Sequence, residues 1–227
     1  MRILGRMPWS SNATFLVEFN PGTSESGETP ITGVYKPAAG EQPLWDFPGG
    51  LWRREIASFE LSDALGFDLV PVTVHRRQGD FGEGSVQLFI DARFEEHYFT
   101  IREMGDHELD DQLRLLSAFD IIANSADRKG GHCLIDPENS IWAIDNGLSF
   151  HSELKLRTVI WDFAGEPIPD SARRGLEVLC NEGAPPVMSE LLDTDEVAAL
   201  LRRAGHLLES GILPFDPTGS RYPWPLV

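Results

Sequence analysis

Apolar and polar positions alternate along the first part of the chain in the pattern that is typical of β-strands. Apolar and β-branched runs predict strands at 14–19, 31–36, 69–74 and 85–90, separated by polar and glycine-rich turns. Apolar residues recur at helical spacing from Leu51 to Leu65, and Gly66 follows them, which predicts one helix in this region. The first part of the chain is therefore predicted to be rich in strands.

The pattern changes after Asp91. Helical spacing of apolar residues predicts helices over 108–124, 171–180 and 195–209, and short apolar runs on either side of Pro137 predict a strand, a turn and a strand. We therefore expect an α+β protein of bilobal layout. Residues 1–91 would form a strand-rich N-terminal lobe, and residues 92–227 a mainly helical C-terminal lobe.

Composition and charge limit the classes of partner. With 41% hydrophobic residues, six Trp and thirteen Phe, the chain of 227 residues has ample material for a packed core. A formal net charge of −17 argues against non-specific binding to nucleic acid or to an anionic membrane, because both are polyanions. No apolar run approaches the ~20 residues of a membrane span, so integral membrane association is not expected. The two cysteines lack metal-ligand spacing, and no signal peptide is recognised, so we expect a cytoplasmic protein.

Two acidic residues flank the expected strand–turn–strand, each in a polar, glycine-containing turn. They are Asp127, in Asn124-Ser125-Ala126-Asp127-Arg128, and Asp145, in Ala143-Ile144-Asp145-Asn146-Gly147. A hairpin between them would bring the two carboxylates together. Phosphoryl transfer requires one carboxylate to orient the attacking hydroxyl and another to hold the metal that neutralises the phosphates. The alternatives are structural: a capping Asp127 beside a solvated Arg128, and a type I′ turn at Asn146-Gly147.

Lys36 ends an apolar strand and is a candidate to bind the phosphates of a nucleotide. We expect Glu55 of the following helix to form an ion pair with it and fix the ammonium. Glu60 is the rival carboxylate, but it lies about 140° around the helix from Glu55, so only one of them faces the cleft. The alternative is an ordinary solvent-exposed lysine at a strand end.

The segment before the first strand is a candidate to arch over the phosphates. The hydroxyl groups of Ser10 and Ser11 and the backbone amides of the segment, which includes Asn12, would take the place of a glycine-rich loop. Neither GxGxxG nor GxxxxGK[ST] occurs, so Rossmann and P-loop interpretations are unsupported. A plain solvent turn is the competing interpretation.

Five motifs in order resemble those of a small bacterial member of the phosphatidylinositol 3-/4-kinase-like superfamily. The chain is also similar to type II phosphatidylinositol 4-kinases and to HipA-type kinases. The motifs cover roughly residues 10 to 165: Gly33-Val34-Tyr35-Lys36-Pro37, Arg54-Glu55-Ile56-Ala57-Ser58-Phe59 with Val70-Pro71-Val72-Thr73, Gly84-Ser85-Val86-Gln87-Leu88-Phe89-Ile90, Asn124-Ser125-Ala126-Asp127-Arg128, and Ile144-Asp145-Asn146-Gly147-Leu148-Ser149-Phe150.

The resemblance implies a protein-kinase-like fold that binds ATP and Mg²⁺. The N-terminal lobe would bind the nucleotide, with the strand containing Gln87, Phe89 and Ile90 leading into an interlobe hinge that contacts adenine. The C-terminal lobe would be catalytic and metal-binding, with Asp127 in the catalytic loop and Asp145 on the metal.

One residue departs from the pattern of these families. They usually place an Asn five residues after the catalytic Asp, where it binds a second metal, and this chain has His132. An imidazole can bind a divalent metal, but magnesium prefers oxygen ligands. This leaves open a one-metal enzyme, a preference for Mn²⁺, or a nucleotide-binding pseudokinase.

Three hypotheses follow for the function. The first is an ATP-dependent kinase whose acceptor is a protein hydroxyl or a small polar metabolite, because the acidic chain offers little basic surface for a lipid membrane. The second is a regulatory module that binds a nucleotide without transferring phosphate. The third is a scaffold that binds no nucleotide. The sequence indicates neither the oligomeric state nor the identity of the acceptor.

Overall fold

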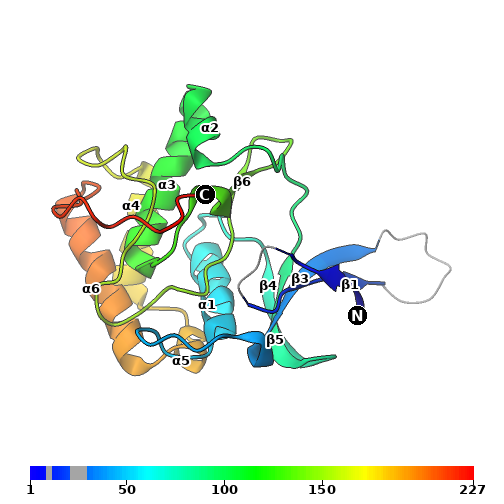
Figure 1. Cartoon of the computed structure of the whole chain (residues 1–227). Coiled ribbons are helices and arrows are strands. Elements are labelled where there is room, and N and C mark those ends of the chain that lie inside the picture. The colour runs from blue at the N-terminus through cyan, green and yellow to red at the C-terminus, as the bar shows by residue number, and fades with distance from the viewer. Residues whose placement is uncertain (9–11, 21–29) are drawn as a thin grey trace.

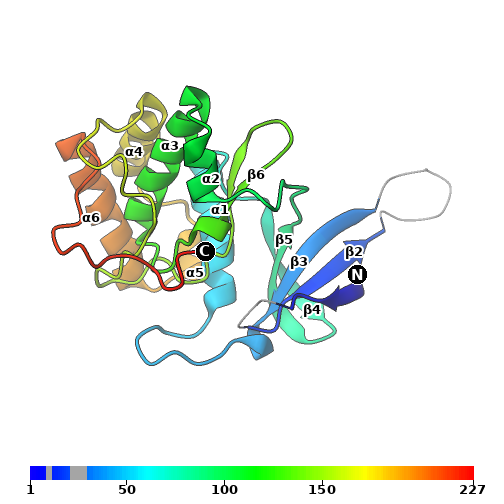
Figure 2. The ribbon, with the colours of Figure 1, turned by 45° about the horizontal axis from the view of Figure 1, so that its top comes forward.

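The strands of the N-terminal part form one antiparallel sheet. The computed structural model describes residues 1–8, 12–20 and 30–227. Within these ranges five strands are ordered β1–β2–β3–β5–β4. Figure 2 shows the sheet on one side of the molecule and most of the helices on the other. The strands are β1 (Arg2–Arg6), β2 (Phe15–Phe19), β3 (Ile31–Pro37), β4 (Thr73–Gly79) and β5 (Gly82–Leu88).

The central strand β3 places Lys36 beside the helical part of the molecule. It pairs with β2 on one side and β5 on the other, and Lys36 lies opposite Ser85 of β5. Alternate residues of β3 are buried, which is the period expected of a strand with one covered face. Val17, Tyr35 and Val86 form the small core of this sheet.

Strand β4 differs from the sequence prediction. The predicted strand began at Leu69, but Leu69 and Val70 are 2% and 3% exposed and pack in the helical core, so the strand begins only at Thr73. The ladder then continues to Gly79, and the turn falls at Asp80-Phe81, followed by Gly82 with φ of 92°. Strand β1 was not predicted.

The helical part contains the three helices that the sequence predicts after Asp91. They are α3 (His107–Ala123), α4 (Asp170–Glu182) and α6 (Thr194–Ser210). The short helices α2 (Tyr98–Glu103) and α5 (Met188–Leu191), and the 3-10 turns η1 (Ala38–Gly40) and η2 (Gly130–His132), were not predicted. The Asp106 carboxylate accepts a hydrogen bond from the Glu108 N–H at 2.8 Å and caps the N-terminus of α3.

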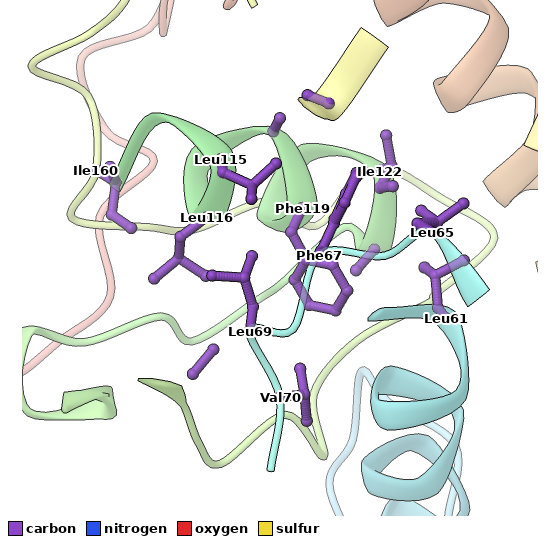
Figure 3. Close-up of a cluster of buried hydrophobic side chains, with 14 of the residues drawn as sticks. Leu61, Leu65, Phe67, Leu69, Val70, Leu115, Leu116, Phe119, Ile122 and Ile160 are labelled. Carbon is purple, nitrogen blue, oxygen red and sulfur yellow. The ribbon is translucent and has the colours of Figure 1, made fainter. Parts of the chain in front are cut away.

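The helix between β3 and β4, α1 (Leu51–Ala64), packs into the core of the helical part. Figure 3 shows Leu65 next to Ile122 of α3 and Leu61 below it, with Phe119 of α3 and Phe67 between them and the more distant Leu115 and Leu116. Leu61, Leu116 and Phe119 are fully buried. Helix α1 is therefore fixed to the larger core while its other face looks toward the sheet (Figure 1). The lobe boundary near Asp91 stays a prediction.

The predicted strand–turn–strand is present as the antiparallel pair β6 (Cys133–Ile135) and β7 (Ile141–Ala143). This hairpin is attached to the segments that join the two parts, because Leu69 O accepts the Ala143 N–H at 2.7 Å and Ile135 O accepts the Arg93 N–H at 2.9 Å. The α+β, bilobal layout is thus confirmed. In the described ranges, no helix combines the length and the apolar composition that a membrane crossing requires.

Candidate active site

Lys36 forms the centre of the candidate site because its ammonium contacts two carboxylates. Nζ is in direct contact with Oε1 of Glu55 and lies 2.9 Å from Oδ1 of Asp145. The predicted ion pair between Lys36 and Glu55 is therefore confirmed, and Glu60 is not part of it. Burial alone would lower the pKa of Lys36, but Asp145 and Glu55 outweigh that effect and raise the pKa above its ordinary value.

Glu55 also fixes the backbone beside Asp145. Its side chain is only 3% exposed, and Oε2 accepts the Asn146 N–H at 3.0 Å. One carboxylate of α1 therefore holds both the cation of β3 and the turn after β7. A buried carboxylate is stable only when it is paired in this way.

Asp145 directs its carboxylate into the same space from a left-handed backbone conformation, with φ of 57°. A type I′ turn at Asn146-Gly147 would need positive φ at both of those residues, and neither has it. That structural alternative is therefore wrong. The side chain of Asp145 is 54% exposed, and the Lys36 ammonium holds its pKa well below the usual range for an aspartate.

Asp127 follows the C-terminus of α3 across a short loop. Asn124, with φ of 55°, caps the helix after Ala123. Its side chain donates to the carbonyls of His151 and Glu153 and accepts the Lys155 N–H. Oδ2 of Asp127 lies 3.1 Å from Nζ of Lys129. The loop is thus anchored to the segment that follows Asp145.

Arg128 is the residue of this site whose role the sequence did not reveal. It is not the solvated side chain of the structural alternative, because it is fully buried and paired with the equally buried Asp120 at 3.0 Å. Its guanidinium also donates to the Ile144 carbonyl at 2.7 Å and to Oδ1 of Asn146. Arg128 therefore ties the loop containing Asp127 to the turn containing Asp145. The only sequence signal was its place directly after Asp127.

His132 links the same two segments. Its Nδ1 lies 3.0 Å from the Asp127 carbonyl oxygen and 3.4 Å from the Lys129 backbone nitrogen. Its Nε2 lies 3.4 Å from Oδ2 of Asp145. Burial lowers the pKa of His132 below its ordinary value, despite the nearby carboxylate of Asp145. A neutral imidazole therefore stands beside Asp145 at neutral pH.

Two neighbouring cavities meet at Lys36 and Asp145. The smaller, of about 150 Å³, is also lined by Glu55 and Asp127, and it includes the predicted Asn12. The larger, of about 380 Å³, is lined by His132 and by Gln87, Phe89 and Ile90, the residues expected near adenine, with further apolar walls from Val34, Phe94, Leu134 and Ile144. Ser10 and Ser11 lie outside the described residues.

The linings of the two cavities suit different halves of a ligand. The larger cavity is mainly apolar, and its volume falls in the range of small-molecule sites. The smaller one collects the charged groups. The arrangement therefore presents an apolar pocket that opens, past a lysine, onto two aspartates.

A divalent metal at this site would need a bound molecule, such as a phosphate compound, to supply some of its oxygen ligands. Among the described residues, no group of three His, Cys, Asp or Glu side chains is placed to hold a metal. Mg²⁺ in nucleotide sites uses one or two carboxylates and completes its shell with phosphates and water. The half-exposed carboxylate of Asp145 fits that requirement, whereas the imidazole of His132 is a poor ligand for Mg²⁺.

Comparison with known proteins places the chain in a family. No protein-family model matches it. It is 36% identical to Protein Rv2133c of Mycobacterium tuberculosis over an alignment of 261 positions that covers 99% of this chain and 91% of the relative. Its structure is similar to that of the Helicobacter pylori proinflammatory kinase CtkA, with a TM-score of 0.51, 12% sequence identity and 93% of both chains covered. The chain has a kinase-like fold and belongs to the same family as Protein Rv2133c of Mycobacterium tuberculosis.

Proposed function

We propose that this protein is an ATP-dependent kinase of the phosphatidylinositol 3-/4-kinase-like superfamily. The observation that carries the proposal is the contact of the Lys36 ammonium with both Glu55 and Asp145, at the junction of an apolar cavity and a charged one. The kinase-like fold supports it. The acceptor is proposed to be a hydroxyl of a protein or of a small polar molecule, as the acidic composition of the chain favours.

The larger cavity would hold the adenine and ribose. Its apolar walls from Val34, Phe89 and Ile144 suit the faces of an aromatic base, and they exclude water from it. The phosphates would then extend past Lys36 into the smaller cavity. There the lysine would bind their oxygens. Its contact with Glu55 would hold the ammonium in the binding position before the nucleotide arrives.

The metal would be held by Asp145. Mg²⁺ is the proposed ion, and Mn²⁺ is the alternative ion to test. When bound, it would neutralise the charge on the phosphates and polarise the terminal one. Lys36 would leave the carboxylate of Asp145 for the phosphates, so that the ion pair serves as a resting arrangement of the site.

Asp127 would orient the acceptor hydroxyl and take its proton. As the new bond between the acceptor oxygen and the γ-phosphorus forms, the bond from that phosphorus to the bridging oxygen of ADP breaks, and the hydroxyl proton passes to the carboxylate. The Lys129 ammonium, 3.1 Å from Oδ2, would hold the carboxylate of Asp127 in position for this role. Arg128 and His132 would hold the loop relative to Asp145.

The test separates binding from transfer. We expect Asp127→Asn to lower ADP formation about 100-fold or more, measured with casein and with the chain itself as hydroxyl sources. The dissociation constant for ATP, measured by calorimetry with Mg²⁺ or Mn²⁺, should change little. Asp111→Asn, which removes a 78% exposed carboxylate on α3, is the matched control and should leave both unchanged. ADP formation at the wild-type rate in Asp127→Asn would sink the proposal.

A second candidate function is nucleotide binding without transfer. The observation that favours it is His132 beside Asp145, at the position where the kinases that the chain resembles place a metal-binding Asn. In that case the wild type would bind ATP and release no ADP, and His132→Asn would introduce transfer. If the wild type is already active, this candidate is excluded.

A further inference from the structure

A separate hollow lies on the helical part, and among the described residues it shares none with the two cavities of the active site. It is a groove of about 580 Å³ between α6, the segment 152–156 and the C-terminal tail 212–221. Figure 1 shows the tail, in red, leaving the end of α6. We call it the α6 groove. The segment 147–156 runs from the charged cavity, which Gly147 and Leu148 line, to this groove, which Leu154 and Leu156 line.

Large apolar side chains stand exposed around the α6 groove. Leu154, Ile212 and Phe215 are 57%, 47% and 68% exposed. The ring of Phe215 lies directly on Gly165, where a Cβ would come within 2.5 Å of its Cζ atom, so the ring position depends on that glycine. Exposed apolar clusters of this kind, bordered by polar residues, are typical of binding surfaces.

The charge of the groove is opposite to that of the protein. The chain carries a formal charge of −17, yet the described residues that line the groove include Arg202, Arg203, Arg221 and His206 and no Asp or Glu. Within the described ranges Arg221 pairs with Asp216 at 3.7 Å, while Arg202 and Arg203 have no carboxylate within ion-pair distance. Two arginines of an acidic protein thus lie at the groove with no ion pair to any residue that the structure describes.

Two backbone carbonyl groups hold the side chain of Arg203 in place. Its guanidinium donates to the Ile122 carbonyl at 2.8 Å and to the His151 carbonyl at 3.3 Å, while its buried Nη2 has no hydrogen-bond partner in the described part of the chain. Burial, together with the neighbouring Arg202, lowers the pKa of Arg203 to about 10, although Glu196 acts in the opposite direction. An unpaired cation at the wall of a groove is stabilised when an acidic group approaches it.

We propose that the α6 groove docks an acidic segment of another protein that carries apolar side chains along one face. Apolar side chains of the partner would cover Leu154, Ile212 and Phe215, and its carboxylates would meet Arg202 and His206, which lie one helical turn apart on α6. An anionic membrane is a poorer occupant, because its charged surface extends beyond the groove and would face the acidic remainder of the chain, whereas a short acidic segment would contact the groove alone. The proposal goes beyond the proposed kinase activity and holds whether or not phosphate is transferred.

The experiment uses designed peptides as probes of the groove. Three fluorescein-labelled peptides of about five helical turns would be compared: one with leucine on one face and glutamate on the other, one with lysine in place of glutamate, and one with serine in place of leucine. Fluorescence anisotropy with the full chain should show saturable binding of the acidic, leucine-containing peptide alone. Added salt should weaken that binding.

Variants then assign the binding to the groove. Arg202→Glu and Phe215→Ser should each weaken binding about tenfold or more. Arg174→Glu makes the same charge change on an exposed position of α4 outside the groove, and it should have no effect. Arg202 and Phe215 are exposed, so the fold should be retained, and thermal melting checks this.

Several outcomes would overturn the proposal. One is equal binding of the lysine peptide, and another is unchanged binding by Arg202→Glu. A third is that the protein sediments with phosphatidylserine vesicles, that Phe215→Ser abolishes this, and that the acidic peptide does not bind. The groove would then be assigned to lipid instead. A dimer in analytical ultracentrifugation that Phe215→Ser dissociates would assign it to a second copy of the chain.

Discussion

Lys36 and Asp145 are 109 positions apart in the chain, and their charged atoms lie 2.9 Å from each other. This contact joins the sheet to the turn after β7, and Glu55 joins both of them to α1. Three segments from different parts of the fold thus meet at one ammonium group. The stability of the protein and its proposed affinity for ATP should therefore both depend on Lys36.

Lys36→Met should weaken ATP binding about tenfold or more and destabilise the protein by about 2 kcal/mol. The reason is that Glu55, which is 3% exposed, would lose the cation that neutralises its buried carboxylate. Calorimetry and urea denaturation measure the two effects. Lys155→Met is the matched control, because the Lys155 ammonium pairs only with Glu153, a 77% exposed side chain 3.7 Å away, among the described residues. Equal losses in both variants would contradict a specific role for Lys36.

Asp120→Asn should destabilise the protein by about 3–5 kcal/mol, because it leaves the buried guanidinium of Arg128 without a counter-charge. Urea denaturation checks the value. The double variant Asp120→Leu with Arg128→Met, which replaces the pair by apolar groups, should recover most of the stability. It should not recover ADP formation, since Asn146 and the Ile144 carbonyl lose the donor that positions them. Recovery of both would show that Arg128 serves stability alone.

The end of the tail should support the loop that contains Asp127. Leu226 O accepts the Gly130 N–H at 2.7 Å, and Val227 lines the larger cavity. Deletion of the last two residues should weaken ATP binding about fivefold, the net effect of one hydrogen bond. Val227→Ser keeps the Leu226 carbonyl and should lose less affinity in the same calorimetric measurement. Equal losses would mean that the side chain, and not the hydrogen bond, matters.

The hydrogen bonds of Asp216 should make part of the stability of the protein depend on pH in acid. Partial burial would raise the pKa of Asp216, but hydrogen bonds from Arg221 and Thr218 outweigh it and lower the pKa to about 2. A carboxyl group whose pKa is lowered by folding contributes its full stabilisation at pH values above its pKa in the unfolded chain, about 3.9. That stabilisation is lost as the pH falls from there toward about 2.

The melting temperatures of the wild type and of Asp216→Asn measure this effect. The variant should melt lower than the wild type from about pH 7 to about pH 4, by a constant difference. Below about pH 4 the difference should shrink as Asp216 takes up its proton. A difference that grows in acid would contradict the assignment of the lowered pKa to these hydrogen bonds.

The elements of the site could be predicted from the sequence because each has a local signal. The period of apolar residues predicts β3, α1, α3, α4 and α6, and polar turns mark the positions of Asp127 and Asp145. The ion pair between Lys36 and Glu55 was predicted because the strand and the helix that present them are adjacent in the chain. The start of β4 was predicted wrongly, since Leu69 and Val70 are apolar for a reason that is not local: they pack in the helical core.

The order of the motifs and the kind of side chain that each one presents can be read from the amino-acid sequence, because spacing and local propensity depend on near neighbours. Which of those side chains meet follows only from the folded chain. Folding buries Arg128 against Asp120 and bends the backbone at Asp145 into the left-handed region. It also gathers Arg202 and Arg203, which have no ion pair among the described residues, beside exposed apolar groups in the α6 groove. Burial and charge pairing depend on contacts between distant segments, and those contacts are set by the packing of the whole chain.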